Sequence, residues 1–90
     1  MKIWASLHNP HQIIRDVVVQ QNGTLPEDLE GWLPCLDSIC QALDIPHPVM
    51  LTKHLQDLLK FSRTVFKSPD FMETVDFHHL VLEVLPEKKK

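Results

Sequence analysis

The chain has 90 residues, 43% of them hydrophobic, and a formal net charge of −3 at pH 7. This length predicts one domain with one modest core, and the apolar content excludes a disordered protein. The acidic balance argues against a dedicated nucleic-acid-binding protein, because that class is usually basic.

The first ten residues carry one lysine and no long apolar run, so the sequence predicts neither a signal peptide nor a membrane-spanning helix. The two cysteines, Cys35 and Cys40, are spaced so that helical geometry puts their side chains about 140° apart. A disulfide between them is therefore geometrically poor. Two free thiols without an export signal are typical of a reducing compartment, so we expect a cytoplasmic protein.

The chain opens with two predicted strands. Apolar and polar side chains alternate weakly in residues 2–8, and residues 12–20 are rich in β-branched side chains. An Asn-Pro pair follows the first segment, and an Asn-Gly pair that readily adopts positive φ follows the second. The sequence therefore predicts a β-hairpin at the start of the chain.

Two amphipathic helices are predicted in the centre of the chain. Leu36, Ile39, Cys40 and Leu43 recur at helical spacing and form one apolar face. The Ile-Pro-His-Pro segment that follows ends this helix, because proline lacks an amide donor and disfavours helical geometry in the residue before it. Thr52 is predicted as the N-cap of the second helix.

Other segments flank these helices. Residues 24–33 are predicted as a loop or a single helical turn, because Gly31 and Pro34 interrupt the helical pattern. Residues 75–85 give the strongest strand signal of the chain. The last five residues, 86–90, are predicted as a disordered, lysine-rich tail.

The order strand, strand, helix, helix, strand predicts an α+β fold. We expect a small antiparallel sheet with two short helices on one face, in a single domain that spans residues 1–85. Residues 63–66 fit either an extended or an irregular segment, so their structure is left open.

Several segments of the chain resemble those of short uncharacterised bacterial proteins of about this length. They are MKIWASL, RDVVVQ, LDSICQALDIPHPVML followed by TKH, and FMETVDF. The resemblance covers most of the chain and implies a bacterial, cytosolic, stand-alone domain. It implies no activity, so it assigns no catalytic or binding residue to this chain.

The six histidines of the chain do not form a recognisable metal-binding pattern. His8 and His11 flank the predicted hairpin turn, and neither a C-x2-C nor an H-E-x-x-H motif occurs. His78 and His79 are adjacent in a predicted strand, where neighbouring side chains point to opposite faces. We therefore expect no bound metal and no other cofactor.

The sequence also offers little that favours catalysis. Cys35 and His54 could act as a nucleophile and a base, but no third group is placed to orient them, and Cys40 is typical of a core thiol. His54 falls on the apolar arc of the second helix, which favours a partly buried histidine bonded to a carbonyl or to a nearby acid such as Asp57. A phosphate-binding loop is excluded because the chain has only two glycines. We therefore do not expect an enzyme.

The last predicted strand has two apolar faces, whereas a half-buried strand alternates apolar with polar residues. Phe77, Val81 and Leu85 make most of the second face, and Trp4 lies opposite the apolar residues of the first strand. An apolar sheet face that no helix covers is usually an interface, so these four residues form the predicted one. The other interpretation is that residues 24–33 fold over this face.

These patterns predict a non-enzymatic interaction module. We expect its apolar sheet face or an edge strand to contact another protein or a second copy of the chain, with no membrane association. The alternative is a nucleic-acid-binding accessory protein that uses a basic helix face of Lys53, Lys60 and Arg63 together with the C-terminal lysines. The acidic balance makes nucleic acid the less favoured partner.

Overall fold

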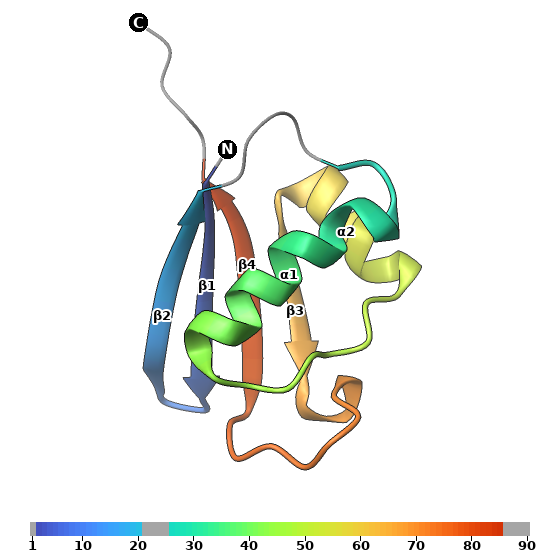
Figure 1. Ribbon diagram of the computed structural model, residues 1–90. Coiled ribbons are helices and arrows are strands. Elements are labelled where there is room, and N and C mark those ends of the chain that lie inside the picture. The colour runs from blue at the N-terminus through green and yellow to red at the C-terminus, as the bar shows by residue number, and fades with distance from the viewer. Residues whose placement is uncertain (1, 21–25, 86–90) are drawn as a thin grey trace, which may run out of the picture.

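The computed structural model describes residues 2–20 and 26–85, so the predicted lysine-rich tail lies outside the described residues. Figure 1 shows the elements in chain order, with α1 crossing in front of the sheet. They are β1 (Lys2–Asn9), β2 (Gln12–Gln20), α1 (Leu29–Leu43), α2 (Thr52–Phe61), β3 (Arg63–Lys67) and β4 (His79–Leu85), with a short 3₁₀ turn at Ser68–Asp70.

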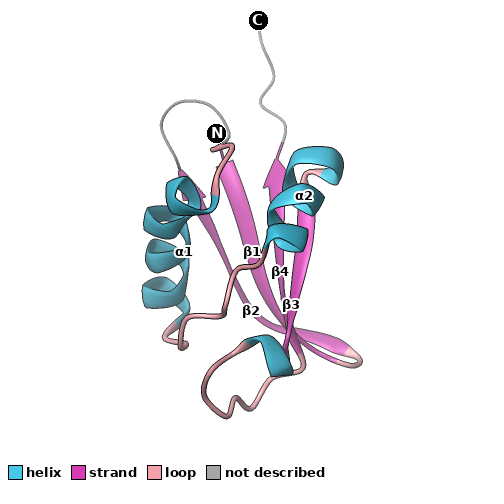
Figure 2. Ribbon diagram, turned by 90° about the vertical axis from the view of Figure 1, so that its right-hand side faces the viewer, coloured by secondary structure: helices cyan, strands magenta, loops and turns pink. Residues whose placement is uncertain are grey.

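The strands form one antiparallel sheet in the order β2-β1-β4-β3, so β2 and β3 are its two edges. The predicted α+β fold and the predicted β-hairpin are confirmed. The sheet has one strand more than predicted, because residues 63–67 form β3. Figure 2 shows α2 standing beside β3, with α1 farther along the sheet.

The core lies between the helices and the inner face of the sheet. Ile3, Ala5 and Leu7 of β1 alternate along the strand and are fully buried there. The apolar face predicted for the first helix is confirmed, since all four of its residues are buried. The other buried core residues are Trp32, Cys35, Leu58, Phe66, Phe71, Phe77, Leu80 and Leu82.

Helix α1 begins at Leu29, so the prediction of a loop or single turn was wrong for residues 29–33. Asp28 is the N-cap: its backbone is extended, and its Oδ1 accepts a hydrogen bond from the Gly31 amide at 2.8 Å. Trp32 then packs into the core and donates from Nε1 to the Pro26 carbonyl at 3.0 Å. Capping and burial together outweigh the low helix propensity of the glycine and the proline.

Replacing Gly31 by alanine should destabilise the protein by about 1–2 kcal/mol, although alanine is the better helix former. A Cβ atom at this position would lie 2.7 Å from Pro26 Cβ and 2.8 Å from Asp28 Oδ1, so it displaces the capping carboxylate. Urea unfolding measures the change. Ser38→Ala on the exposed side of α1 is the control and should leave stability unchanged or slightly higher. A Gly31→Ala protein that is more stable than the wild type would contradict this explanation of the helix start.

The break between the helices lies where the prolines predict it, after Leu43. Asp44 adopts a left-handed conformation with φ of 57°, and the linker continues to Leu51. Thr52 is the first helical residue rather than the predicted N-cap, which is Leu51. At the other end of α2, Ser62 with φ of 59° turns the chain directly into β3. This one-residue turn forces α2 and β3 to lie side by side.

Candidate interaction sites

Phe77, one of the four predicted interface residues, belongs to the core. Strand β4 begins at His79, so the prediction of a strand from residue 75 was wrong for the first four residues. Phe77 lies in the preceding loop and packs edge-on against Phe71, with ring centroids 5.1 Å apart. It is buried within the fold and has no free surface for a partner.

Val81 lies on the outer face of the sheet, opposite the helices, but it is only 4% exposed. Ser6 of β1 and Val65 of β3 stand on either side of it in the strand register. Trp4 and Leu85 on the same face are half-buried. The four predicted interface residues therefore do not form one exposed surface, because neighbouring strands shield the outer face at its centre.

The exposed apolar side chains of the sheet gather instead on β2, a surface that the sequence prediction missed. Ile13, Ile14 and Val18 are 48%, 41% and 52% exposed. Trp4 stands beside Val18 in the register and donates from Nε1 to Asp16 Oδ2 at 2.9 Å. The run of β-branched residues predicts a strand here, but it does not distinguish an edge strand from a central one.

The ladder pattern determines which backbone groups face outward at the two edges. The Val84 amide donates to the Ser62 carbonyl at 2.7 Å, which shows which alternate residues of β4 and β3 bond to each other. In an antiparallel sheet, successive residues of a strand bond alternately to its two neighbours. The same alternation therefore holds from β4 through β1 to β2, and it identifies the residues whose backbone groups have no neighbouring strand. The outward-facing residues are Asp16, Val18 and Gln20 on β2, and Arg63, Val65 and Lys67 on β3.

A second surface is a hollow of about 420 Å³ between α2 and the free edge of β3. Lys53, Asp57 and Phe61 recur every four residues on α2, so they form one stripe along the hollow. The stripe spans about 12 Å and the facing five-residue strand about 13 Å, so the two walls match in length. The other lining residues are His54, Arg63, Thr64, Val65 and Lys67.

The predicted basic face is divided between two elements. Lys53 and Lys60 lie on α2, but Arg63 lies on β3, so the assignment of all three to one helix face was wrong. Lys53 and Arg63 line the hollow together with Lys67. The carboxylate in its lining is Asp57, whose Oδ2 accepts from the Thr64 hydroxyl at 3.2 Å. Positive charge therefore dominates this hollow in a chain whose net charge is negative.

His54 lines the same hollow but has a structural role. It is 1% exposed and packs on Phe66 with ring centroids 4.3 Å apart. Its Nδ1 accepts from the Leu51 amide at 2.9 Å, so the neutral ring carries its proton on Nε2. Nε2 lies 3.5 Å from Asp70 Oδ2 and makes no closer hydrogen bond to any described residue. Since its only acceptor nitrogen is already used, neutral His54 is not available as a general base.

The two thiols are not activated nucleophiles. Cys35 and Cys40 are free and buried on α1, and burial raises the pKa of each to about 11. The Asp37 carboxylate adds to the increase in the pKa of Cys40. Both side chains are therefore protonated at neutral pH, whereas a thiol needs the thiolate form to attack a substrate.

The histidines of the sheet form contacts that the sequence did not predict. His8 stacks on His79 across β1 and β4, with ring centroids 4.7 Å apart. His78 lies just before β4, and its Nδ1 is 2.7 Å from Nδ1 of His79, so these two rings meet although they are adjacent in the chain. Within residues 2–20 and 26–85, no group of three or more histidine, cysteine or acidic side chains has a geometry that could hold a metal ion.

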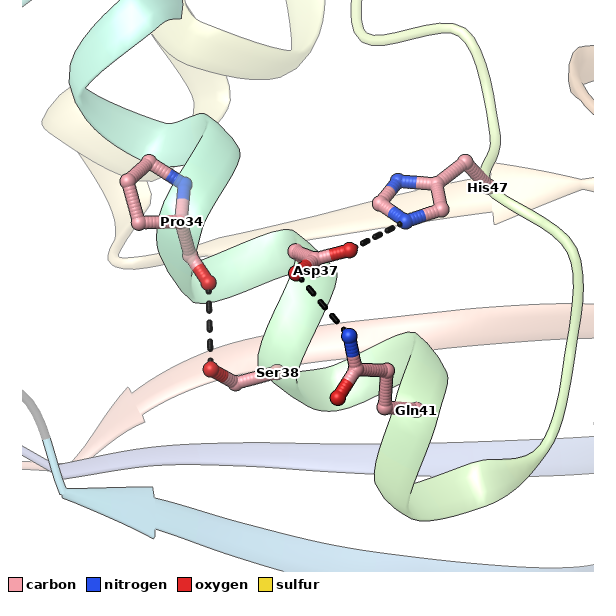
Figure 3. A network of polar contacts seen from close by, with 5 residues as sticks. All are labelled: Pro34, Asp37, Ser38, Gln41 and His47. Atoms are coloured by element: carbon pink, nitrogen blue, oxygen red, sulfur yellow. Dashed lines mark hydrogen bonds and ion pairs between the residues drawn. The ribbon is translucent and has the colours of Figure 1, made fainter.

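Hydrogen bonds hold the linker that positions α2. His47 Nε2 lies 2.9 Å from Asp37 Oδ1 on α1, and Asp37 also accepts from Gln41 at 3.1 Å (Figure 3). Farther along the linker, the Val49 amide donates to the Asp70 carbonyl at 2.7 Å. The linker is thus anchored to α1 on one side and to the turn after β3 on the other, which fixes α2 against β3.

No protein-family model matches the chain, and no curated protein or solved structure matches it significantly. The resemblance to short bacterial proteins therefore stays a prediction. None of the helices in the described part of the chain is long and apolar enough to cross a membrane.

Proposed function

We propose that the protein is an interaction module that pairs with a second copy of itself through β2. The observation that supports this proposal is an edge strand of nine residues with outward backbone groups and exposed Ile13, Ile14 and Val18. Such an edge is a template for another strand unless charges, prolines or bulges protect it. Between Gln12 and Gln20 the strand has no lysine and no proline, and its single bulge lies near its start. Its two charged residues are Arg15, on the inner face, and Asp16, whose carboxylate accepts a hydrogen bond from Trp4.

The symmetry of a dimer restricts the register of this pairing. Two antiparallel edge strands in one continuous sheet are related by a two-fold axis normal to the sheet, so paired residues must share a face. The outward-facing residues must also pair with each other. Three registers satisfy both conditions near the middle of the strand, and they are centred on Asp16, Val17 or Val18.

The side chains favour the register centred on Val18. In it, Val18 lies opposite Val18 of the partner subunit, and Val17 lies opposite Val19 of the partner subunit. A register centred on Asp16 places two carboxylates opposite each other, and one centred on Val17 places Asp16 opposite Val18 of the partner subunit. The Val18 register pairs valine with valine three times and keeps the two Asp16 carboxylates, one from each subunit, apart. It also brings Trp4 of each subunit close to the central pair.

Sedimentation velocity over a range of concentrations tests the proposal. The wild type should form dimers at high concentration, and Val18→Lys should abolish the dimer because it puts two ammonium groups side by side at the two-fold axis. Leu33→Lys is the matched control, since Leu33 is an equally exposed apolar residue on α1, at 51%. A wild type that stays monomeric at millimolar concentration, or two variants with the same behaviour, would contradict pairing through β2.

The nucleic-acid alternative has less support from the geometry. The cations on α2 and β3 surround a hollow that also contains the Asp57 carboxylate and the apolar ring of Phe61. The hollow is bounded by the backbone edge of β3, whose amides and carbonyls can pair with a polypeptide strand but give no continuous positive track for a phosphate backbone. We therefore favour a polypeptide as the partner at both edges of the sheet.

A further inference from the structure

We propose that the groove between α2 and β3 binds an extended acidic segment of another polypeptide, which adds to the sheet as a strand beside β3. This groove lies at the opposite edge of the sheet from β2, so the inference does not depend on self-association. Strand addition of this kind obtains affinity from backbone hydrogen bonds and specificity from alternate side chains.

The edge of β3 offers backbone groups for one short strand. Arg63 and Val65 each direct an N–H and a C=O away from β4. Lys67 offers its C=O only, because its N–H donates to Asp70 Oδ2 at 3.0 Å. A bound segment can therefore make a complete hydrogen-bonded pair with Val65, flanked by pairs at either end of β3.

The charges around the groove select an acidic partner. Lys53, Arg63 and Lys67 line it together with one carboxylate, that of Asp57, which accepts a hydrogen bond from Thr64, so the lining is positive on balance. Glu83 of β4 lies opposite Arg63 in the register, but no ion pair joins these two described residues. Arg63 lines the groove, where carboxylates on the bound segment would pair with its guanidinium.

The positions of these side chains define the pattern of the ligand. In an antiparallel segment, the residue opposite Val65 shares the outer face with it, where a β-branched side chain packs well. In the bound segment, the residues two positions before and two positions after this one lie opposite Lys67 and Arg63, and a glutamate at each position would pair with the cation. The two intervening residues face α2, one near Lys53 and the other near Phe61, which is 72% exposed. From its N-terminus, the segment therefore has the pattern Glu-Glu-Val-Leu-Glu.

The groove is already formed in the free protein. The linker before α2 is held by the Val49 amide and by a bridge between Pro48 and Phe71. Ser62 holds the other end of α2 directly against β3. This protein therefore loses little conformational entropy when a partner strand binds, which favours binding of a short segment.

Titration of the ¹⁵N-labelled protein with the peptide acetyl-Glu-Glu-Val-Leu-Glu-amide, followed by NMR, tests the inference. Amide shifts should change at Arg63, Val65 and along α2, while the amides of β2 stay unchanged. The variant Arg63→Glu should weaken binding about five- to tenfold, because it replaces one attraction by a repulsion. Arg15→Glu on β2 is the control, since it changes the net charge equally at the far edge, and it should leave the affinity unchanged.

Two further ligands separate strand addition from charge attraction alone. The same peptide with an N-methylated valine keeps all charges but loses a backbone donor and the space for close pairing, so it should bind at least fivefold more weakly. A single-stranded oligonucleotide should bind more weakly than the peptide at the same salt concentration. The inference is overturned if the peptide does not shift the β3 amides, if the methylated peptide binds equally well, or if the oligonucleotide is the tighter ligand.

Discussion

Replacing Phe66 by alanine should lower the free energy of unfolding by about 3–5 kcal/mol. Phe66 is fully buried, stacks on His54 and stands beside Leu80 in the strand register. Its ring fills the space between α2 and the edge strand, so alanine leaves a cavity that the anchored linker prevents from closing. Such a loss is a large part of the total stability of a domain of this size.

Urea unfolding measures this effect, and Phe61 supplies the matched control. Phe61 is also a phenylalanine of the α2–β3 unit, but it is 72% exposed, so Phe61→Ala should change stability by no more than about 0.5 kcal/mol. The same control variant should weaken binding of the acidic peptide, because Phe61 lines the groove. Equal destabilisation by the two substitutions would show that β3 and α2 do not pack as described.

Stability should also fall as the pH decreases through the range in which exposed histidines titrate. Burial is the main reason why the pKa of His54 lies below its usual value of 6.5, and Lys53 lowers the pKa further. The carboxylates of Asp70 and Asp57 oppose this change without reversing it. The pKa of His79 is also lowered, chiefly by burial and then by the neighbouring imidazole of His8.

The sign of the pH effect follows from proton binding. Below about pH 6.5 the unfolded chain takes up a proton on each histidine, whereas the folded chain keeps His54 and His79 neutral until a lower pH. Stability is therefore fully present above pH 6.5 and is lost below it. Each of these histidines contributes a slope of at most about 1.4 kcal/mol per pH unit.

Unfolding in urea between pH 5.5 and 8 measures this slope. His54→Gln removes the titrating ring and keeps an acceptor that can reach the Leu51 amide, so the fall in stability should become less steep. His79→Gln should do the same to a smaller extent, because His79 is less buried. An unchanged slope in the His54→Gln protein would mean that this histidine takes up its proton over the same pH range in the folded and the unfolded chain, which would contradict the lowered pKa.

The sequence predicted the elements whose signal is local and periodic. The apolar face from Leu36 to Leu43 and the break at the two prolines depend on spacing within one segment, and both are present in the structure. Helix α1 starts earlier than predicted because the Asp28 cap and the burial of Trp32 outweigh the helix-breaking residues. This balance depends on tertiary packing, which the pattern of one segment does not contain.

The candidate sites were harder to predict, because they depend on the order of the strands. Two apolar faces on the last strand indicated an uncovered surface, but β4 is central, and its neighbours shield Val81. Residues 12–20 have a less conspicuous pattern, yet their place at the edge leaves Val18 half exposed. Of the three residues predicted as one basic helix face, Lys53 and Arg63 line the groove with Val65 and Lys60 does not, because Arg63 belongs to β3 and reaches the groove only through the turn at Ser62.

Hydrogen exchange of single backbone amides tests the role of the β2 edge most directly. The amides of Asp16 and Val18 point away from the sheet in one subunit, so they are unprotected unless a second strand pairs with them. If β2 is the self-association surface, NMR at high protein concentration will show slow exchange at these two amides and fast exchange after dilution. Exchange at the same fast rate at every concentration would contradict pairing through this edge.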